Sequence, residues 1–468
     1  MEIYTYGHEA ENGVRQIMQL FFSLGDDVRV ESKLEGRRAT AEIYAFGKIS
    51  TGEAFSGSDE RLYITNAIKK SVFYAAKKLS DMPAPWGIST GIRPAKGARK
   101  MLSDYSEDEI LNHLKNEYLM DDKKARLAIE VARREEKILS SMPSESVSIY
   151  VGIPFCPSRC SYCSFISQAI AHNNKYVKPY IDAVLKEIEH TGRIIKELGM
   201  KVDTVYFGGG TPTAIAPAEL ERLIVSLDEN MDLSRVREFC VEAGRPDTFT
   251  SEMMNMLKRN NVGRISINPQ SMHQKTLDAV GRHHRIEDVE KAFYLAREAG
   301  IESINADLIA GLPGEDTEMM KYTVEKILAM NPEAVTVHTL YMKRASEMID
   351  EFEKIRFTKN AAAMVDTATM MLKGEGLMPY YMYKQRNTLG NLENAGFAKC
   401  GHESLYNVYI MEEVQPILAI GAGGSTKMVM GEEIERVFNP KEASDYTNRI
   451  DEVLKRKDVF YDFYKRRM

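Results

Sequence analysis

Between residues 147 and 340 the sequence alternates six short apolar segments with longer amphipathic stretches. The apolar segments have the length and composition of buried strands, and they lie at 147–153, 202–207, 238–242, 264–267, 303–309 and 334–340. The amphipathic stretches have helical spacing and lie near 175–198, 217–230, 250–260, 286–299 and 316–329. Because parallel neighbours need helical crossovers, this order predicts an α/β fold with a parallel sheet. An incomplete barrel and an open doubly wound sheet both satisfy the pattern.

The segment before this repeat has a different pattern. Apolar residues recur at helical spacing over 14–24 and again over 62–79. Two strand-like runs, 28–33 and 39–46, flank Glu35-Gly36-Arg37 and predict a hairpin. Charge-rich helices are expected over 106–140. These features predict a small α+β domain.

The repeat also has recognisable boundaries. The sequence SSMPSES at 140–146 is typical of a linker, and from 376 the chain becomes rich in loop-forming residues. We therefore predict three parts. They are an N-terminal α+β accessory domain at 1–145, the strand–helix domain at 146–375, and a C-terminal region at 376–468 that closes the substrate side.

Charge and composition exclude several classes of protein. The 468 residues include 62 Lys and Arg against 68 Asp and Glu, and the net charge of -6 argues against a general nucleic-acid binder. No apolar run reaches the ~18 residues that a membrane span needs, and the N-terminus has no apolar signal region. Five cysteines in so long a chain do not resemble a disulfide framework. We expect a cytoplasmic protein without a membrane span.

Three of the five cysteines lie within eight residues, at Cys156, Cys160 and Cys163, directly after the first predicted strand. Loops at the carboxyl ends of parallel strands are where sites are usually built. Clustered thiolates can hold a soft metal or an iron–sulfur cluster. Structural zinc normally needs a second pair of ligands, and Cys240 and Cys400 are isolated, so an iron–sulfur cluster is favoured over zinc or chance. Three ligands would leave one iron open to a substrate or cofactor.

The CxxxCxxC spacing after the first of six strand–helix units resembles the radical S-adenosylmethionine (SAM) superfamily. The resemblance implies an incomplete (β/α)6 barrel and a 4Fe–4S cluster whose open iron is chelated by SAM. It also implies that one electron cleaves SAM to a 5′-deoxyadenosyl radical, which abstracts a hydrogen atom. Residues 150–165 are similar to the oxygen-independent coproporphyrinogen III oxidase (dehydrogenase) family. The segments WGISTGIRPAK at 86–96 and NLENAG at 391–396 resemble its HemZ-type branch.

The resemblance implies SAM contacts at five strand ends. The segment GGGTPT at 208–213 matches the loop that binds the methionyl end of SAM, where glycines allow close approach of the backbone. Glu242 ends the third strand, while Gln270 and Arg282 have the family's twelve-residue spacing. Asp307, in isolation a helix cap or turn residue, matches a residue near the SAM ribose. The implied SAM-binding residues are Tyr150, Gly209, Gly210, Thr211, Glu242, Gln270, Arg282 and Asp307.

Two positions depart from the best-studied oxidases. Those proteins carry another Cys two positions after the third ligand and a His before Ile-Pro-Phe, where this chain has Phe165 and Gly152. The Cys-x-Phe form also occurs in a related haem-binding chaperone branch. That branch has a C-terminal His-Asn-x-x-Tyr-Trp motif, which is absent at 405–410. The chain therefore lies between the two branches.

The leading hypothesis is that the protein oxidatively decarboxylates the A- and B-ring propionates of coproporphyrinogen III to give protoporphyrinogen IX in haem biosynthesis. A tetrapyrrole with four carboxylates would need a basic lining. Its candidate residues are Arg282, His283, His284, Arg285, Lys384 and Arg386. We also expect Arg93 to lie on the substrate side and Trp86 to pack a domain junction.

Two alternatives remain open at this point. One is a haem-binding or delivery protein that keeps the cluster, and the other is a radical SAM enzyme that acts on a different substrate. Flavodoxin or ferredoxin is the electron donor that the resemblance implies. The sequence identifies no catalytic side chain.

Overall fold

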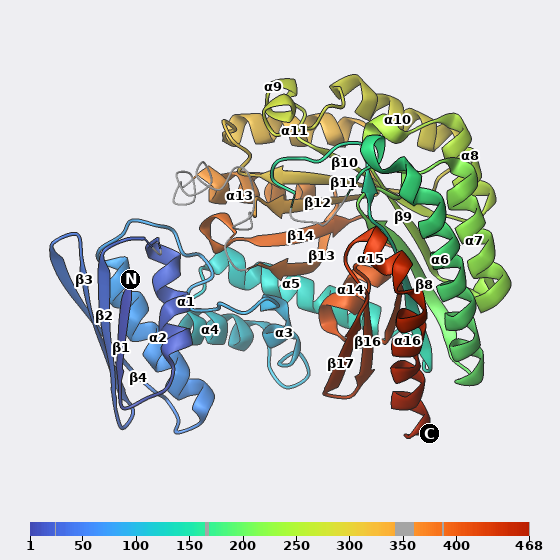
Figure 1. Cartoon of the computed structure of the whole chain (residues 1–468). Coiled ribbons are helices and arrows are strands. Elements are labelled where there is room, and N and C mark those ends of the chain that lie inside the picture. Colours follow the sequence, from blue (N-terminus) through green and yellow to red (C-terminus); the bar gives the residue numbers. More distant parts are fainter. Residues whose placement is uncertain (24, 164–167, 342–359, 386–387, 468) are drawn as a thin grey trace. The chain divides into compact units, whose positions relative to one another are not determined.

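The computed structural model describes residues 1–23, 25–163, 168–341, 360–385 and 388–467 (Figure 1). The chain divides into two compact units. Unit 1 comprises Met1–Arg134, Thr339–Asp366 and Met382–Asn394, and unit 2 comprises Glu135–His338, Thr367–Tyr381 and Ala395–Met468. The three-part division at 145 and 375 stays a prediction. Within the described residues, no helix has both the length and the apolar character required to cross a bilayer.

The predicted strand–helix repeat forms the centre of a long mixed sheet. Its six strands are β5 (Ser146–Ile153), β8 (Lys201–Gly209), β9 (Glu238–Gly244), β10 (Arg264–Gln270), β11 (Ser303–Ala310) and β12 (Ala334–Thr339). They are neighbours in that order, and the pairs from β5 to β11 are parallel. The parallel sheet that the strand–helix repeat predicts is therefore confirmed. These strands are almost continuously buried, as expected for parallel strands covered on both faces.

The crossover helices lie along the outside of these strands (Figure 1). They are α6 (Ile170–Glu197), α7 (Pro217–Met231), α8 (Ser251–Arg259), α9 (Gln274–Ala279), α10 (Ile286–Glu298) and α11 (Thr317–Ala329). Local chemistry explains where several begin. The side chains of Thr250 and Asp316 accept the backbone N–H groups of Met253 and Met319, so each caps the first turn of its helix. Such caps fix the lengths of the preceding loops, which carry the site residues.

The C-terminal region is more regular than its loop-forming composition predicts. Strand β15 (Ile417–Ile420) lies parallel beside β5, and β16 (Ser425–Met430) and β17 (Glu433–Phe438) extend the sheet antiparallel. β15 covers the free edge of β5, which would otherwise expose unpaired backbone groups. At the other side of the six strands, β14 (Glu393–Ala398) pairs antiparallel with β12, and β13 (Met378–Lys384) follows it.

Three helices complete this C-terminal region, namely α14 (Leu405–Glu412), α15 (Ala443–Asn448) and α16 (Ile450–Lys465). Lys457 of α16 forms a buried ion pair with Glu187 of α6 at 2.7 Å. Glu187 also accepts the backbone N–H of Gly421 at 2.7 Å and the hydroxyl of Tyr446 at 2.6 Å. One buried carboxylate thus joins α6 to three parts of the C-terminal region. Removing either charge of this pair would leave the other buried and unpaired.

Unit 1 contains a separate four-stranded sheet. It consists of β1 (Glu2–Tyr6), β2 (Val28–Glu35), β3 (Arg38–Ala45) and β4 (Lys48–Phe55) in that order. Helices α1 (Glu11–Phe21) and α2 (Arg61–Lys77) cover one face with a shared apolar core. The predicted hairpin is confirmed by the antiparallel pairing of β2 and β3. Leu24, expected in the first helix, lies outside the described residues.

Strands β1 and β4 were not predicted, because more than half of their side chains face solvent and interrupt the apolar run. A glycine allows α2 to pack directly on β4. A Cβ atom on Gly52 would lie 2.1 Å from the carbonyl oxygen of Ser71. The chain also forms the helices α3 (Pro94–Arg99), α4 (Glu107–Tyr118), α5 (Asp122–Leu139) and α13 (Asn360–Gly374).

Candidate functional site

The three clustered cysteines lie just beyond the carboxyl end of β5. Cys156 ends the two-residue strand β6 (Phe155–Cys156), which pairs with β7 (Gln168–Ala169). The backbone N–H of Cys163 donates to the carbonyl of Cys160 at 3.1 Å. Cys160 is buried, whereas Cys156 and Cys163 are partly exposed. Phe165, at the position where the best-studied oxidases carry Cys, lies outside the described residues.

The glycine loop after β8 is hydrogen-bonded to this cysteine loop. Gly210 donates its N–H to Ile153 at 2.8 Å, and Thr211 donates its N–H to Phe155 at 2.7 Å. The Thr211 hydroxyl lies 3.6 Å from the sulfur of Cys156. A Cβ atom on Gly210 would lie 2.8 Å from the same sulfur, so only glycine fits. The cysteine loop and the glycine loop, the first two predicted motifs, therefore form one surface.

Arg282 brings the segment after β10 to the cysteines. Its Nη1 atom is 3.8 Å from the sulfur of Cys160 and 3.2 Å from the hydroxyl of Tyr162. Its Nη2 atom donates to the carbonyls of Gly244, at 3.0 Å, and Asn268. The guanidinium thus connects the ends of β9 and β10 to the cysteine loop.

Glu242 and Asp307 lie at the ends of β9 and β11. The hydroxyl of Tyr206 donates to Glu242 Oε1 at 2.5 Å. Burial raises the pKa of Glu242 to about 7, and the negative charge of Asp307 adds to the effect. Asp307 accepts a hydrogen bond from Asn305 at 2.7 Å and lies 3.7 Å from His338 Nε2. Glu242 therefore changes charge near neutral pH.

Gln270 ends β10 with an unusual backbone. Its φ angle of 69° lies in the left-handed region, which a residue with a side chain rarely adopts. Only 8 % of the residue is exposed, and its side-chain oxygen has no hydrogen-bond partner among the described residues. A buried acceptor without a donor is costly, and a bound ligand with an N–H or O–H group would satisfy it.

Tyr150 belongs to a stack of three tyrosines. Its ring centroid is 6.3 Å from those of Tyr206 and Tyr406, whose rings are 4.5 Å apart. Burial raises the pKa values of all three phenols, so they stay neutral. Tyr406 comes from α14 and was not predicted as a site residue. Its only sequence signal was an aromatic residue in the region where the chaperone motif is missing.

Arg245 was also missed, although it follows the predicted Glu242 by three residues. It lies 3.9 Å from the sulfur of Cys160 and forms an ion pair with Asp247 at 3.0 Å. The sequence signal was an Arg at a strand end, a residue type that usually lies on a solvated surface. The structure instead buries it against the cysteine loop.

Only some of the six residues predicted as a basic lining have the positive charge that this role requires. His284 is fully buried, and this burial together with the charges of Arg282 and Arg245 lowers its pKa to about 3. The prediction that His284 supplies positive charge is therefore wrong. His283 and Arg285 are exposed.

Lys384 and Arg386 are the remaining members of that lining. Lys384 is buried in unit 1, where its Nζ atom donates to the carbonyl of Ser89 at 2.7 Å. Arg386 lies outside the described residues. Of the six candidates, Arg282 is the one that reaches a clustered cysteine through a described contact.

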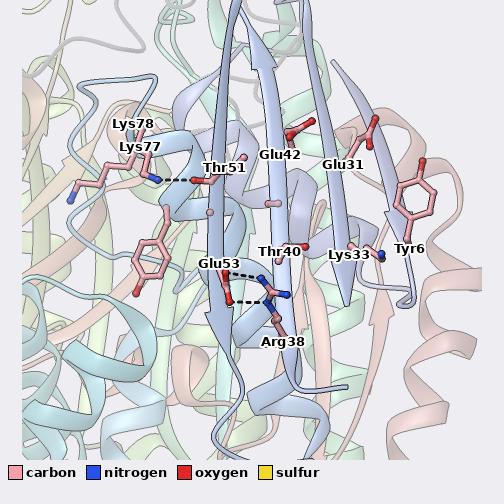
Figure 2. Close-up of a pocket in the computed structure, with 13 residues that line it drawn as sticks. Tyr6, Glu31, Lys33, Arg38, Thr40, Glu42, Thr51, Glu53, Lys77 and Lys78 are labelled. Carbon is pink, nitrogen blue, oxygen red and sulfur yellow. Dashed lines mark hydrogen bonds and ion pairs between the residues drawn. The ribbon is translucent and has the colours of Figure 1, made fainter. Parts of the chain in front are cut away.

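A separate hollow of about 1020 Å³ lies on unit 1 (Figure 2). It is lined by side chains of the four-stranded sheet and of α2, and it contains none of the predicted SAM-binding residues. Its charges are largely compensated. Arg38 pairs with Glu53 through two hydrogen bonds of 2.8 and 3.1 Å, and Lys78 donates to the carbonyl of Thr51 at 2.7 Å. The reactive side chains therefore gather at the cysteine loop and not in this hollow.

The cysteine loop and the strand ends around it have the composition that an iron–sulfur cluster and SAM require. Thiolates are the usual protein ligands of such clusters. Gly210 brings its backbone close to the sulfur of Cys156, and Gln270 offers an unsatisfied acceptor. The residues present therefore fit both groups.

Three comparisons relate this arrangement to known proteins. Residues 150–327 match the model of the Radical SAM superfamily. The oxygen-independent coproporphyrinogen-III oxidase-like protein HemZ of Bacillus subtilis is 41% identical over 399 residues, which are 82% of this chain and 79% of that protein. The heme chaperone HemW of the same organism is 30% identical over 281 residues, covering 59% of this chain and 69% of HemW.

The solved structure of coproporphyrinogen III oxidase (HemN) from Escherichia coli has a similar fold. The TM-score is 0.52 and the sequence identity is 22%, over 71% of this chain and 73% of that one. This likeness confirms the radical SAM type of α/β fold that the resemblance of the cysteine motif implies. The small N-terminal sheet in unit 1 agrees with the expected α+β part.

Proposed function

The chain belongs to the HemN/HemZ-type family of radical SAM proteins, and on that premise we propose that it converts coproporphyrinogen III to protoporphyrinogen IX by oxidative decarboxylation. The family is one of radical SAM enzymes related to coproporphyrinogen III oxidases, and its superfamily uses a 4Fe–4S cluster and SAM. The choice of substrate rests on the 41% identity to a protein named as oxidase-like.

One observation supports this proposal above the others. The cysteine loop, the glycine loop and the ends of β9 and β10 meet around the sulfurs of Cys156 and Cys160. We assign the cluster to Cys156, Cys160 and Cys163, and SAM to the eight residues implied by the resemblance. When bound, the cluster and SAM supply a 5′-deoxyadenosyl radical by one-electron reductive cleavage.

The chain's own residues position and shield these groups. The hydroxyl of Tyr206 and the backbone N–H of Gly209 hold the Glu242 carboxylate, which keeps lone pairs for a ligand amino group. Gln270 offers its unsatisfied oxygen to another donor. The stack of Tyr150, Tyr206 and Tyr406 provides an apolar wall that excludes water. Exclusion of water protects a radical from side reactions.

We place the protein in the cytoplasm with flavodoxin or ferredoxin as electron donor. All five cysteines lie within the described residues and none of them forms a disulfide there, which agrees with a reducing compartment. A one-electron donor is needed because each reductive cleavage of SAM would consume one electron.

Haem binding or delivery is the second candidate function. The relative named heme chaperone is 30% identical over 281 residues, and this favours a haem-binding role over an unrelated one. A radical SAM reaction on another substrate is the third.

The test is anaerobic incubation of reconstituted protein with coproporphyrinogen III, SAM and a reductant. We expect protoporphyrinogen IX by mass spectrometry, together with 5′-deoxyadenosine. The Cys163→Ala variant should form neither product, whereas Cys400→Ala should form both, because Cys400 is isolated and exposed. Deoxyadenosine without a vinyl product would indicate another substrate. Stoichiometric haem binding without turnover would support the second candidate.

A further inference from the structure

Arg245 is a buried arginine directed at the cysteine loop. Only 3 % of it is exposed. Its Nε and Nη2 atoms each lie 3.0 Å from one carboxylate oxygen of Asp247. The remaining nitrogen, Nη1, points away from that ion pair, towards Ser158 Oγ at 3.0 Å and the sulfur of Cys160 at 3.9 Å.

A second guanidinium reaches the same sulfur. Arg282 Nη1 is 3.8 Å from Cys160, so this thiol lies within donor distance of two arginines. Cys156 has a different environment, since the donor described at its sulfur is the neutral hydroxyl of Thr211 at 3.6 Å. Both of the guanidinium groups described at the cysteine loop therefore reach the sulfur of Cys160.

Charge next to a cluster ligand has a defined consequence. A reduced cluster carries one more electron than an oxidised one, and nearby cations or hydrogen bonds to sulfur favour the reduced state. Burial strengthens the effect because it lowers the local dielectric constant. Asp247 partly offsets the charge of Arg245, but it is exposed to solvent while the guanidinium is not.

We propose that Arg245 is a positioning residue that acts through Cys160 and makes the bound cluster easier to reduce. It does so by adding a second cation to the one supplied by Arg282. The inference rests on the cysteine assignment in the proposed function, but it does not depend on which substrate the enzyme uses.

The test is a redox titration of the reconstituted full-length protein without substrate, followed by electron paramagnetic resonance. At the wild-type midpoint potential, Arg245→Gln should lower the ratio of reduced to oxidised cluster about tenfold, which corresponds to about 59 mV for one electron. Arg245→Lys keeps the charge and should give a smaller decrease. Dithionite is the reductant throughout.

The Asp247→Asn variant should change the ratio of reduced to oxidised cluster in the opposite direction. It removes the carboxylate that offsets Arg245 while keeping an oxygen acceptor for the guanidinium. The ratio of reduced to oxidised cluster should therefore rise about threefold. A purely structural role for the Arg245–Asp247 pair predicts no such reversal between the two variants.

Arg237→Gln is the matched control. Arg237 forms a similar two-point ion pair with Asp203, at 2.6 and 2.8 Å, but it lies before β9 rather than after it. Its described contacts include none of the clustered cysteines. The midpoint potential of the cluster in the Arg237→Gln variant should equal that of the wild type.

Iron and sulfide content is measured for every variant. If Arg245→Gln retains its cluster and titrates like Arg237→Gln, the proposal is wrong. If Arg245→Gln loses iron, Asp247→Asn decides the question, and an unchanged or lowered ratio in that variant would overturn the proposal. A wild-type protein that binds no iron–sulfur cluster would instead refute the cysteine assignment.

Discussion

The indole N–H of Trp86 donates to the carboxylate of Glu393 at 2.7 Å, although 307 positions separate the two residues. Both lie within unit 1, and each is only 1 % exposed. The other carboxylate oxygen accepts Lys124 Nζ at 2.7 Å, and Lys124 also pairs with Asp366 at 2.9 Å. Burial alone would lower the pKa of Lys124, but the two carboxylates outweigh it and raise the pKa to about 12. The two HemZ-like segments therefore meet in one buried ionic cluster.

Replacing Glu393 by Gln should destabilise the protein strongly. The amide still accepts the Trp86 hydrogen bond, but Lys124 loses its buried partner and keeps only Asp366. Breaking a buried pair in this way costs about 3–5 kcal/mol. Denaturation can be followed through Trp86 fluorescence, because the chain has a single Trp.

The matched control for this change is Glu53→Gln. Glu53 pairs with Arg38 on the solvent-exposed face of the sheet in unit 1. The unfolding free energy should hardly change, since exposed ion pairs contribute little. Equal losses in the two variants would show that burial of Glu393 does not matter.

Lys384 should make stability depend on alkaline pH. Burial lowers its pKa to about 7, and the nearby Lys69 and Lys124 act in the same direction against the attraction of Glu393. Between pH 7 and 10 the unfolded chain then holds a proton on this amine that the folded chain lacks. Stability therefore rises with pH in this range, by up to about 1 kcal/mol per pH unit.

The measurement compares the wild type with Lys384→Met at pH 7, 8 and 9. The difference in unfolding free energy, wild type minus variant, should increase over this series. Lys77→Met, on the exposed side of α2, serves as the control and should give a constant difference. A difference that stays constant for Lys384→Met as well would contradict the lowered pKa.

Glu242 should impose a pH dependence on SAM binding. Because burial raises its pKa to about 7, the carboxylate is mostly neutral at pH 6 and mostly ionised at pH 8. The ionised form attracts the cationic groups of SAM, so affinity should increase several-fold across this range. Anaerobic equilibrium dialysis measures it directly.

The Glu242→Gln variant should bind SAM weakly and without that pH dependence. Glu221→Gln, which removes a surface carboxylate bonded to Arg259, should keep the wild-type profile. A pH profile in Glu242→Gln identical to that of the wild type would assign the dependence to another group.

The cluster assignment predicts a difference among the five cysteines. Reconstituted wild-type protein should contain about four iron and four sulfide per chain. Alanine at Cys156, Cys160 or Cys163 should abolish this content. Alanine at Cys240, buried in β9, or at exposed Cys400 should preserve it. One zinc per chain without sulfide would refute the radical SAM site.

The sequence determined the main fold and the edge at which the site lies. Six apolar segments separated by amphipathic helices allow few arrangements, and parallel strands place all their carboxyl ends on one rim. Cys156, Glu242 and Gln270 lie at or after strand ends, so this rule places them at one rim, whereas their assignment to the site comes from the family resemblance. Strands with one solvent-exposed face, such as β1 and β4, lack a continuous apolar signal and were therefore missed. Their place was decided by pairing with β2 and β3.

Only the tertiary structure decided which polar side chains meet. Arg245 reaches Cys160 across 85 positions, and Trp86 reaches Glu393 across 307. Spacing along the chain predicts contacts within a strand or a helix, because the backbone there has a fixed repeat. Contacts between loops from different strands depend instead on how each loop folds and on which neighbours exclude water. The physical role of Arg245 or Glu393 therefore follows from burial and partners that no local pattern specifies.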